Sequence, residues 1–312
     1  MRLRSTSFPI LVLVAGNFAA VCPGIAQSPN SAALMTSSAP SLPSVPGSLS
    51  TEQIKALIQK VAANDIQNDK RQRDYTYTER DVERSLDGKG RVKSTDTSTY
   101  DVLNIYGEEV QRLIEKNDKP VSAKEAAKQE EKIQKLINKR EHESDKDREK
   151  REERQAKDRE EDRQFEREIV DAYNFKLLGT EQVDGRDAWV ISAEPRPGFV
   201  PHMKYANYLP KFHGRIWIDK ADVQMSKMDV EALDTVSWGL FLARFHKGSQ
   251  FMIEQTRINN EVWLPRAVNF NIGVRLAMLK NFNMDVEQTF RDYKKFRADS
   301  KIIGVGEVQN DR

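Results

Sequence analysis

The chain has 312 residues, with 50 basic and 48 acidic side chains; 38% of its residues are hydrophobic and 31% are charged. Soluble domains average roughly 45–50% apolar and about 25% charged residues, so part of this chain lies outside a packed core. A single cysteine excludes intrachain disulfides and multi-cysteine zinc sites, and four scattered histidines argue against a histidine-built metal site. The near-zero net charge argues against a dedicated nucleic-acid-binding protein.

The N-terminus has the features of a secretory signal peptide over residues 1–26. Two arginines near the start precede an apolar run from Phe8 to Val21, which is shorter than the ~20 residues needed to span a bilayer. Gly24 and Ala26 supply the small side chains expected at positions −3 and −1, so we predict cleavage after Ala26. The mature protein is therefore expected in the periplasm.

Cys22 allows a second interpretation of the same segment, in which the cysteine carries a lipid anchor. A lipoprotein signal places a small residue before the modified cysteine, and Val21 fits this position poorly. Residues 27–50 are uncharged and rich in serine and proline, which predicts a flexible linker under either interpretation.

Helical and strand periodicities follow the linker. Apolar residues recur at spacings of three and four over 51–67, which predicts an amphipathic helix with Ser50 as its N-cap. The period changes to two at Tyr75, and long antiparallel strands joined by a turn at 87–90 are expected as far as Lys116. Many residues of these strands are polar on both faces, so we expect the strands to reach beyond the core.

A long charged helical insertion is predicted over residues 122–173. Its only extended apolar stripe lies within 123–137, and a single alanine is the only hydrophobic residue in 138–164. Opposite charges spaced four apart each stabilise a helix by ~0.2–0.5 kcal/mol. The pattern leaves two alternatives: one helix over 123–173, roughly 75 Å long at 1.5 Å per residue, or two helices separated near 143–146.

Strand patterns resume at Asn174 and continue with regular turns. The stretch 235–246 is compatible with a strand or with a short buried helix. The clearest alternation runs over 267–278 and again over 282–290, with apolar residues on one face and polar residues on the other. An antiparallel sheet with this pattern is covered on one side only.

These elements predict an α+β fold over 51–312, a curled antiparallel half-barrel sheet with a helical lid plus the charged insertion. Helices 51–67 and 123–137 are the expected lids. A curled sheet under a helical lid can enclose an apolar cavity, and methionine and aromatic side chains suit such a lining, although an apolar stripe in a sheet is more often ordinary core. The candidate lipid-cavity residues are Tyr75, Tyr77, Tyr100, Trp189, Met225, Met228, Trp238, Phe270 and Met284.

The strand GRIWID at 214–219 with its Asp-Lys turn, and the closing hairpin with EVWLP at 261–265, resemble the superfamily of periplasmic lipoprotein carriers and receptors of the LolA/LolB type. This superfamily includes the lipid-sensing regulators of the RseB type. The resemblance covers roughly 51–121 and 174–297. It implies a half-barrel whose cavity holds lipid or the acyl chains of a lipoprotein. The charged segment 138–164 departs from the family pattern and suggests a partner-binding arm.

No motif for an enzyme is present: the chain has no G-x-S-x-G, no H-E-x-x-H and no glycine-rich phosphate loop. Asp219 and Asp222 are interpreted as turn residues. We therefore predict a non-enzymatic, exported bacterial envelope protein without catalytic residues, metal or cofactor, which binds lipid or lipoprotein acyl chains in a sorting-like role. The alternative is an interaction or signalling module that binds an envelope protein through 138–164. Nucleic acid is a poor partner, because the acids of this segment cancel its bases.

Overall fold

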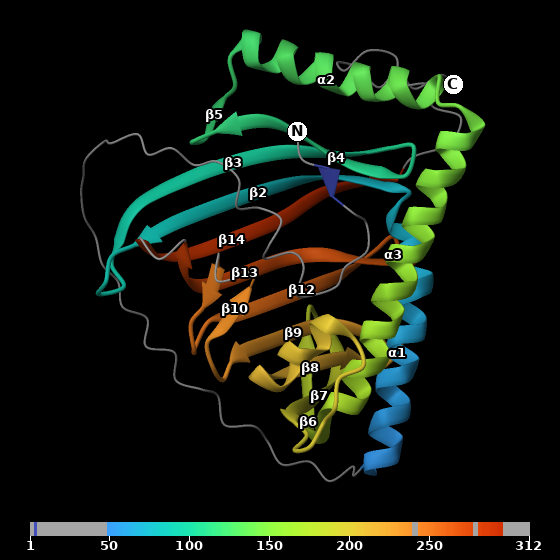
Figure 1. Cartoon of the computed structure of the whole chain (residues 1–312), viewed down its shortest axis with the longest axis vertical. Coiled ribbons are helices and arrows are strands. Elements are labelled where there is room, and N and C mark those ends of the chain that lie inside the picture. Colours follow the sequence, from blue (N-terminus) through green and yellow to red (C-terminus); the bar gives the residue numbers. More distant parts are fainter. Residues whose placement is uncertain (1–2, 5–48, 239–242, 277–279, 296–312) are drawn as a thin grey trace.

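The structure is a computed structural model that describes residues 3–4, 49–238, 243–276 and 280–295. It contains one antiparallel sheet of fourteen strands, with helices packed against it (Figure 1). The elements in chain order are β1 (Leu3–Arg4), α1 (Thr51–Gln72), β2 (Tyr75–Leu86), β3 (Val92–Ile105), β4 (Glu108–Lys116), β5 (Lys119–Pro120), α2 (Ala123–Glu141), α3 (Asp145–Ala172), β6 (Tyr173–Val183), β7 (Arg186–Pro195), the 3-10 helix η1 (Lys204–Lys211), β8 (Phe212–Asp219), β9 (Gln224–Ala232), β10 (Val236–Trp238), β11 (Ala243–Phe245), β12 (Gln250–Ile258), β13 (Val262–Leu276) and β14 (Lys280–Lys295).

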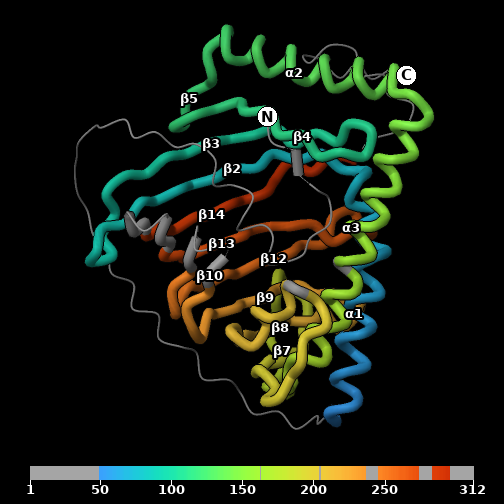
Figure 2. Tube along the Cα trace, in the orientation of Figure 1, coloured from blue at the N-terminus to red at the C-terminus, as the bar shows by residue number. Residues whose placement is uncertain are grey.

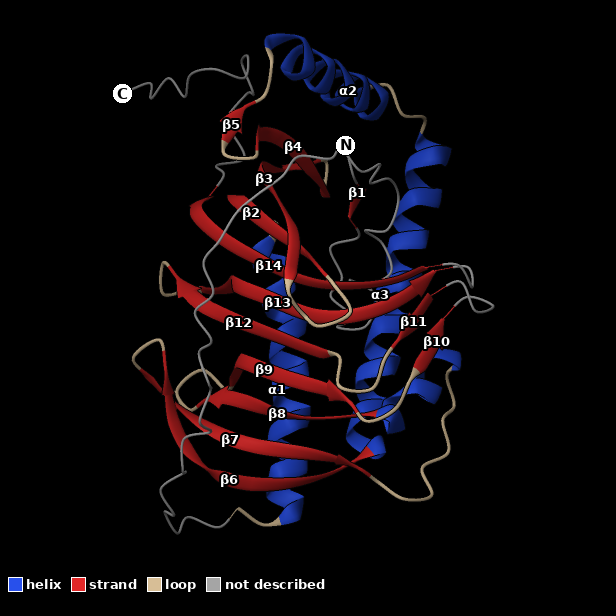
Figure 3. Ribbon diagram, turned by 90° about the vertical axis from the view of Figure 1, so that its left-hand side faces the viewer, coloured by secondary structure: helices blue, strands red, loops and turns tan. Residues whose placement is uncertain are grey.

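Eleven of the fourteen strands follow the order β1-β4-β3-β2-β14-β13-β12-β9-β8-β7-β6 across the sheet, and β5, β10 and β11 pair beside this path. Within the described residues the first and last strands of this path do not pair, so the sheet is a curled half-barrel rather than a closed barrel (Figure 3). This confirms the predicted fold class. The ambiguous stretch 235–246 contains the short strands β10 and β11, which pair with each other, while residues 239–242 lie outside the described residues.

Helix α1 packs against one face of the sheet, which we call the α1 face. The strand register identifies this face, since directly opposed residues of neighbouring antiparallel strands share a side. Ile191, Ile216, Met228, Ile253 and Val268 lie opposite one another on β7, β8, β9, β12 and β13. The α1 face is therefore continuous across the lower half of the sheet in Figure 3.

Both ends of α1 are fixed by hydrogen bonds. At its start, the Ser50 side chain accepts from the Gln53 backbone N–H at 3.2 Å, while the Gln53 side chain accepts from the Ser50 N–H at 2.7 Å. Near its end, the buried Asn68 amide donates to the Trp263 carbonyl and accepts from the Trp263 N–H, both at 2.8 Å. Asn68 thus makes the two backbone hydrogen bonds to Trp263 that a neighbouring strand would otherwise make to β13.

The body of α1 buries Ile54, Ile58 and Val61 beneath the sheet and the end of α3, and each such side chain stabilises the fold by about 1.5–3 kcal/mol. The predicted lid helix is confirmed, and it extends to Gln72. We call the surrounding buried residues the lid core. Its members are Ile54, Ile58, Val61, Phe165, Val170, Ala172, Tyr173, Phe175, Ile191, Ala206, Leu209 and Ile218.

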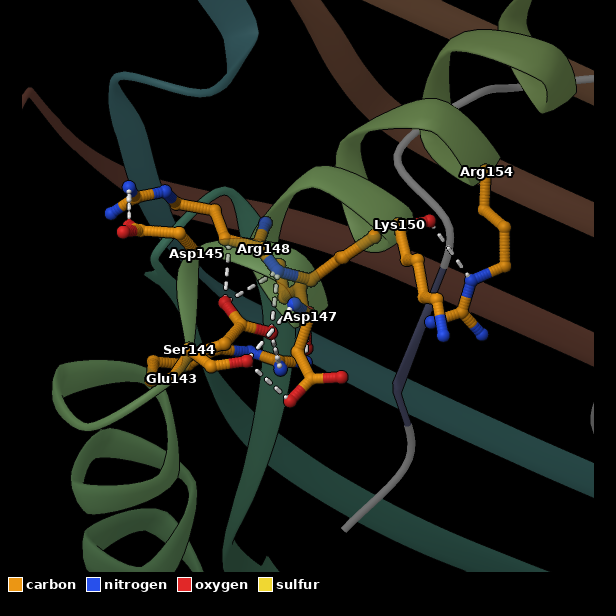
Figure 4. Close-up of polar contacts among 10 residues, drawn as sticks. Glu143, Ser144, Asp145, Asp147, Arg148, Lys150 and Arg154 are labelled. Carbon is orange, nitrogen blue, oxygen red and sulfur yellow. Dashed lines mark hydrogen bonds and ion pairs between the residues drawn. The ribbon is translucent and has the colours of Figure 1, made fainter.

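The charged insertion forms two helices, so the alternative of one unbroken helix is wrong. Helix α2 ends at Glu141 and Ser144 caps α3, accepting a hydrogen bond from the Asp147 N–H at 3.2 Å (Figure 4). A serine hydroxyl forms hydrogen bonds with nearby backbone groups, so serine is more favourable at an N-cap than inside a helix. This preference explains why the helix is interrupted at Ser144. Beyond it, α3 runs beside α1 (Figure 2) and ends in the lid core.

Helix α2 packs on the face opposite to α1. Its Ile133 and Leu136 contact Ile105 and Val110, whereas the α1 face of β3 carries the alternate residues, such as Val102. The prediction that 123–137 closes the same face as 51–67 is therefore wrong. An apolar stripe on a helix needs an apolar surface to pack against. Each face of this sheet offers such a surface, so the stripe alone does not determine which face α2 covers.

A group of ion pairs ties the corner between α2 and α3 to the start of β4. Arg140 pairs with Glu108 and with Glu143, and Arg151 pairs with Glu143 at 2.9 Å. All four side chains are between 8% and 14% exposed. The corner is therefore anchored to the sheet, although most of α3 between 145 and 164 is exposed.

Candidate ligand-binding face

A second group of apolar side chains lies on the α1 face, on strands beyond those that form the lid core. We call this group the apolar cluster. Its buried members are Met228, Ile253, Val268, Phe270, Ile272 and Phe290. They come from β9, β12, β13 and β14, where the period-two alternation places every second residue on this face.

Several members of the apolar cluster remain only half-buried. These are Tyr77, Val230, Phe251, Met284 and Val286. Their rings and chains are held by packing: Phe251 lies 4.9 Å from Phe270 between ring centroids, and Tyr77 lies 5.8 Å from Phe290. This part of the α1 face therefore offers an ordered apolar surface that is partly open to solvent.

Four of the predicted lining residues, Tyr77, Met228, Phe270 and Met284, belong to the apolar cluster. A fifth, Met225, packs against both the apolar cluster and the lid core and so connects them. The structure thus brings these five side chains to one continuous surface. That they contact a lipid stays a prediction.

The other four predicted lining residues lie elsewhere. Trp189 packs against the lid core, with the Lys220 ammonium 5.9 Å from its ring. Tyr75 is 3% exposed in a separate small cluster, where its hydroxyl donates to Glu261 at 2.6 Å. Tyr100 is half-buried on β3, and the side chain of Trp238 lies outside what the structure describes.

Two buried carboxylates next to the apolar cluster were missed by the sequence interpretation. Glu79 is 0% exposed and Asp81 is 6% exposed, and both lie on the α1 face of β2. The Gln288 amide nitrogen donates to Glu79 at 3.0 Å and to Asp81 at 2.9 Å, and the Gln111 amide donates to Glu79 at 2.8 Å. We call these four residues the acid–amide group.

The acid–amide group borders directly on the apolar cluster. Glu79 lies opposite Phe290 in the register of β2 and β14, and Glu83, two residues beyond Asp81, lies opposite Val286. The alternating acids in the sequence ERDVE were the available signal, because a period of two places all three on one face. The burial of Glu79 and Asp81 was the unexpected part.

The electrostatic influence of these acids reaches the rim of the apolar cluster. Burial raises the pKa of the Tyr293 hydroxyl well above its ordinary value, and the charges of Glu109 and Glu79 raise it further. This hydroxyl donates to the Pro265 carbonyl. Tyr293 is therefore a neutral donor at physiological pH.

The acidic turn residues of the sequence interpretation have a structural role. Asp219 accepts hydrogen bonds from the Ala221 and Asp222 N–H groups at 3.0 and 2.8 Å and pairs with Arg186 at 2.7 Å. Burial alone would raise the pKa of Asp219, but these hydrogen bonds lower it overall. Among the described residues no group of three or more His, Cys, Asp or Glu is arranged to hold a metal ion.

No helix in the described ranges is long and apolar enough to cross a bilayer. No family model and no curated protein sequence matches the chain.

Several solved structures are similar to it. An outer membrane lipoprotein-sorting protein domain from Vibrio parahaemolyticus matches 78% of this chain and 95% of its own, with 10% identity and a TM-score of 0.33. The LolA superfamily protein NE2245 from Nitrosomonas europaea matches 80% of this chain and 95% of its own, with 10% identity and a TM-score of 0.27. The Pseudomonas aeruginosa MucA/MucB complex matches 78% of this chain and 99% of its own, with 11% identity and a TM-score of 0.21. The superfamily that the sequence resembles is represented among these structures.

Proposed function

We propose that this protein is an exported, non-enzymatic envelope protein that binds lipid or the acyl chains of a lipoprotein on its α1 face. The observation that carries the proposal is the apolar cluster, whose half-buried members form a surface that α1 leaves partly open. Contiguous apolar side chains that remain accessible on a protein surface are typical of binding sites for an apolar partner. Export through residues 1–26 and a periplasmic location belong to the same proposal.

The side chains of the surface suit a flexible hydrocarbon chain. Phe251 and Phe270 provide flat ring surfaces, while Met284 and Met225 provide unbranched side chains that adapt to an irregular ligand. Methylene groups buried there would each contribute about 0.8 kcal/mol to binding. A chain of about ten methylenes would gain about 8 kcal/mol, which alone corresponds to a Kd of about 1 μM. The cost of association and of ordering the chain weakens this value, so a single chain is expected to bind more weakly than about 1 μM.

The test is the binding of a dansyl-labelled undecanoic acid to the full chain, followed by the blue shift and increase of dansyl emission. Val286→Asp places a charge in the half-buried part of the apolar cluster and is expected to weaken binding at least about tenfold. Val92→Asp is the matched control, because Val92 is 55% exposed at the start of β3 and lies outside the cluster. Absence of binding, or equal binding by both variants, would contradict the proposal.

A second candidate function is supported by α3, whose exposed half between 145 and 164 is anchored through Arg151 and Glu143 rather than free. Such a fixed, charge-balanced helix could present a partner-binding surface for an envelope protein over 138–164. A photo-crosslinking residue at Ala156, which is exposed, should then capture one defined envelope protein in the native host. The same residue placed at the exposed Glu131 of α2 should not capture that protein.

A further inference from the structure

We propose that the loop between β7 and β8, residues 196–211, docks the protein on an anionic phospholipid membrane. We call it the docking loop. The proposal goes beyond the proposed function, because it concerns the surface of a bilayer rather than one bound lipid, and it rests on residues outside the apolar cluster. The evidence is the juxtaposition of exposed apolar side chains and basic residues on one ordered loop.

The docking loop carries a large part of the exposed apolar surface. Among the described residues five large hydrophobic side chains are exposed, and two of them lie in this loop: Val200 is 70% exposed and Tyr205 is 44% exposed. A third, Leu233, is 38% exposed, and its N–H donates to the carbonyl of Lys211, the last residue of the loop, at 2.8 Å. Single exposed apolar residues are common, but several of them on one segment indicate a contact surface.

The backbone of the docking loop is held by hydrogen bonds, so this exposure does not come from a loose segment. From α3, the buried Glu168 carboxylate accepts from the His202 N–H at 2.9 Å and from the Met203 N–H at 2.6 Å. The Tyr173 hydroxyl donates to the Leu209 carbonyl at 2.7 Å, and the Leu209 side chain is buried. Figure 1 shows the loop, in yellow, beside α3. The exposed side chains are therefore presented by an ordered backbone.

The charge of the docking loop indicates the kind of surface that it binds. The loop contains Arg196, Lys204 and Lys211 and no acidic residue, although 48 of the 312 residues of the chain are acidic. Arg196 is exposed, whereas Lys211 pairs with Asp234 at 3.5 Å, so the loop keeps a net positive charge. Each basic residue close to an anionic membrane strengthens binding about fivefold. Phosphate headgroups are the complementary partner.

The residue types of the docking loop are those of an interfacial membrane contact. Tyrosine is enriched where lipid headgroups meet the hydrocarbon region, because its ring is apolar and its hydroxyl is polar. The exposed Val200 can enter the boundary of the acyl chains, while Arg196, in the same loop, stays at the level of the phosphates. Apolar burial and electrostatic attraction then act together on one short segment.

Packed apolar side chains connect the docking loop with the α1 face. Phe199 and Met203, which flank Val200 in the sequence, pack against the lid core. Met225 packs against both the lid core and the apolar cluster. A bilayer in contact with the loop would therefore lie at one end of a continuous series of apolar side chains. This continuity favours a membrane over a soluble protein as the partner.

The test places the environment-sensitive dye NBD on the docking loop of the full chain. Cys22→Ser removes the only cysteine, and Val200→Cys then provides one labelling site; Val92→Cys, at a position that is 55% exposed at the start of β3, is the matched control. Vesicles contain equal parts of phosphatidylcholine and phosphatidylglycerol. We expect NBD emission at position 200 to shift to the blue and to be quenched by spin-labelled lipid, and emission at position 92 to stay unchanged. Both chains carry the same N-terminal segment, so adsorption through that segment affects both positions alike.

A second measurement tests the charge of the docking loop. Arg196→Glu changes the loop by two charge units and should raise the vesicle concentration at half-saturation of the signal from position 200 at least about tenfold. Lys89→Glu makes the same change at the exposed turn between β2 and β3 and should leave this concentration unaltered.

Several results would overturn the proposal. These are no shift at position 200, equal shifts at positions 200 and 92, or equal effects of the two charge variants. A shift at position 200 that needs no vesicles and grows with protein concentration would identify a second copy of the chain as the partner, and it would also overturn the proposal. Val286→Asp, which disrupts the apolar cluster, should leave the vesicle signal intact, so the loss of acyl-chain binding and the loss of membrane docking are separate results.

Discussion

Asp65 on α1 is predicted to make the stability of this protein fall as the pH rises from 4 to 7. Its carboxylate accepts a hydrogen bond from the buried Gln224 at 2.9 Å, which joins α1 to β9. The pKa of Asp65 is raised from 3.8 to about 6. Burial is the largest cause, the neighbouring charge of Asp69 adds to the rise, and the Gln224 hydrogen bond opposes it.

The sign follows from the proton count. Between pH 4 and pH 6 the folded protein holds a proton on Asp65 that the unfolded chain has lost, so this group favours the folded state most fully below its ordinary pKa. That contribution is lost as the pH rises through about 6. A change from 3.8 to about 6 corresponds to about 3 kcal/mol, since one pKa unit equals about 1.36 kcal/mol.

Asp65→Asn removes the charge and keeps an oxygen that can accept from Gln224. Because the Asp65 side chain retains some contact with solvent, we expect about half of the full value, a gain of about 1–2 kcal/mol in the free energy of unfolding at pH 7.5. At pH 4 the gain should be close to zero. Urea denaturation followed by tryptophan fluorescence measures both values.

The matched control is Asp74→Asn, an exposed position just beyond α1, which should change stability by less than about 0.5 kcal/mol at either pH. Equal effects of Asp65→Asn at pH 4 and pH 7.5, or destabilisation at pH 7.5, would refute the reasoning. Comparing each variant with the parent at one pH cancels the titration of all other acids.

Two further substitutions test the packing of the fold by the same denaturation assay. Arg140→Ala removes the partner of Glu108 in the anchored corner, where both side chains are no more than 14% exposed, and should lower the free energy of unfolding by about 2–3 kcal/mol. Its control is Arg148→Ala, which breaks an exposed pair and should lower it by less than about 0.5 kcal/mol. Gly214→Ala places a Cβ 2.3 Å from the backbone oxygen of Asp229 and should cost about 2 kcal/mol or more, whereas Gly88→Ala meets nothing within 4 Å and should be nearly neutral. Equal losses within either pair would contradict these assignments.

The sheet and the first helix could be predicted because their signals are local. Alternation in 267–290 and the N-cap at Ser50 depend on residues that lie close together in the sequence. The break between α2 and α3 could not be decided, because charged helix formers surround Ser144 on both sides and only its cap marks the boundary.

The candidate site was only partly predictable for a physical reason. Met228 and Phe270 are apolar residues on alternating strands, so their shared face follows from their spacing. The burial of Glu79 depends on Gln288, which is 209 residues away and reaches it only through the pairing of β2 with β14. No pattern of neighbouring residues indicates such a long-range hydrogen bond. The face of the sheet on which α2 packs could not be predicted for the same reason, because it too depends on contacts between residues far apart in the sequence.

Gln129 of α2 shows how this protein keeps an outer strand from joining a neighbouring molecule. Its side-chain amide accepts from the Leu113 N–H at 2.8 Å and donates to the Leu113 carbonyl at 3.2 Å, while β5 pairs with the next residues of β4. An unsatisfied strand margin is a template for aggregation. Gln129 imitates one residue of an added strand, so the backbone N–H and carbonyl of Leu113 are already paired and offer no template to another strand.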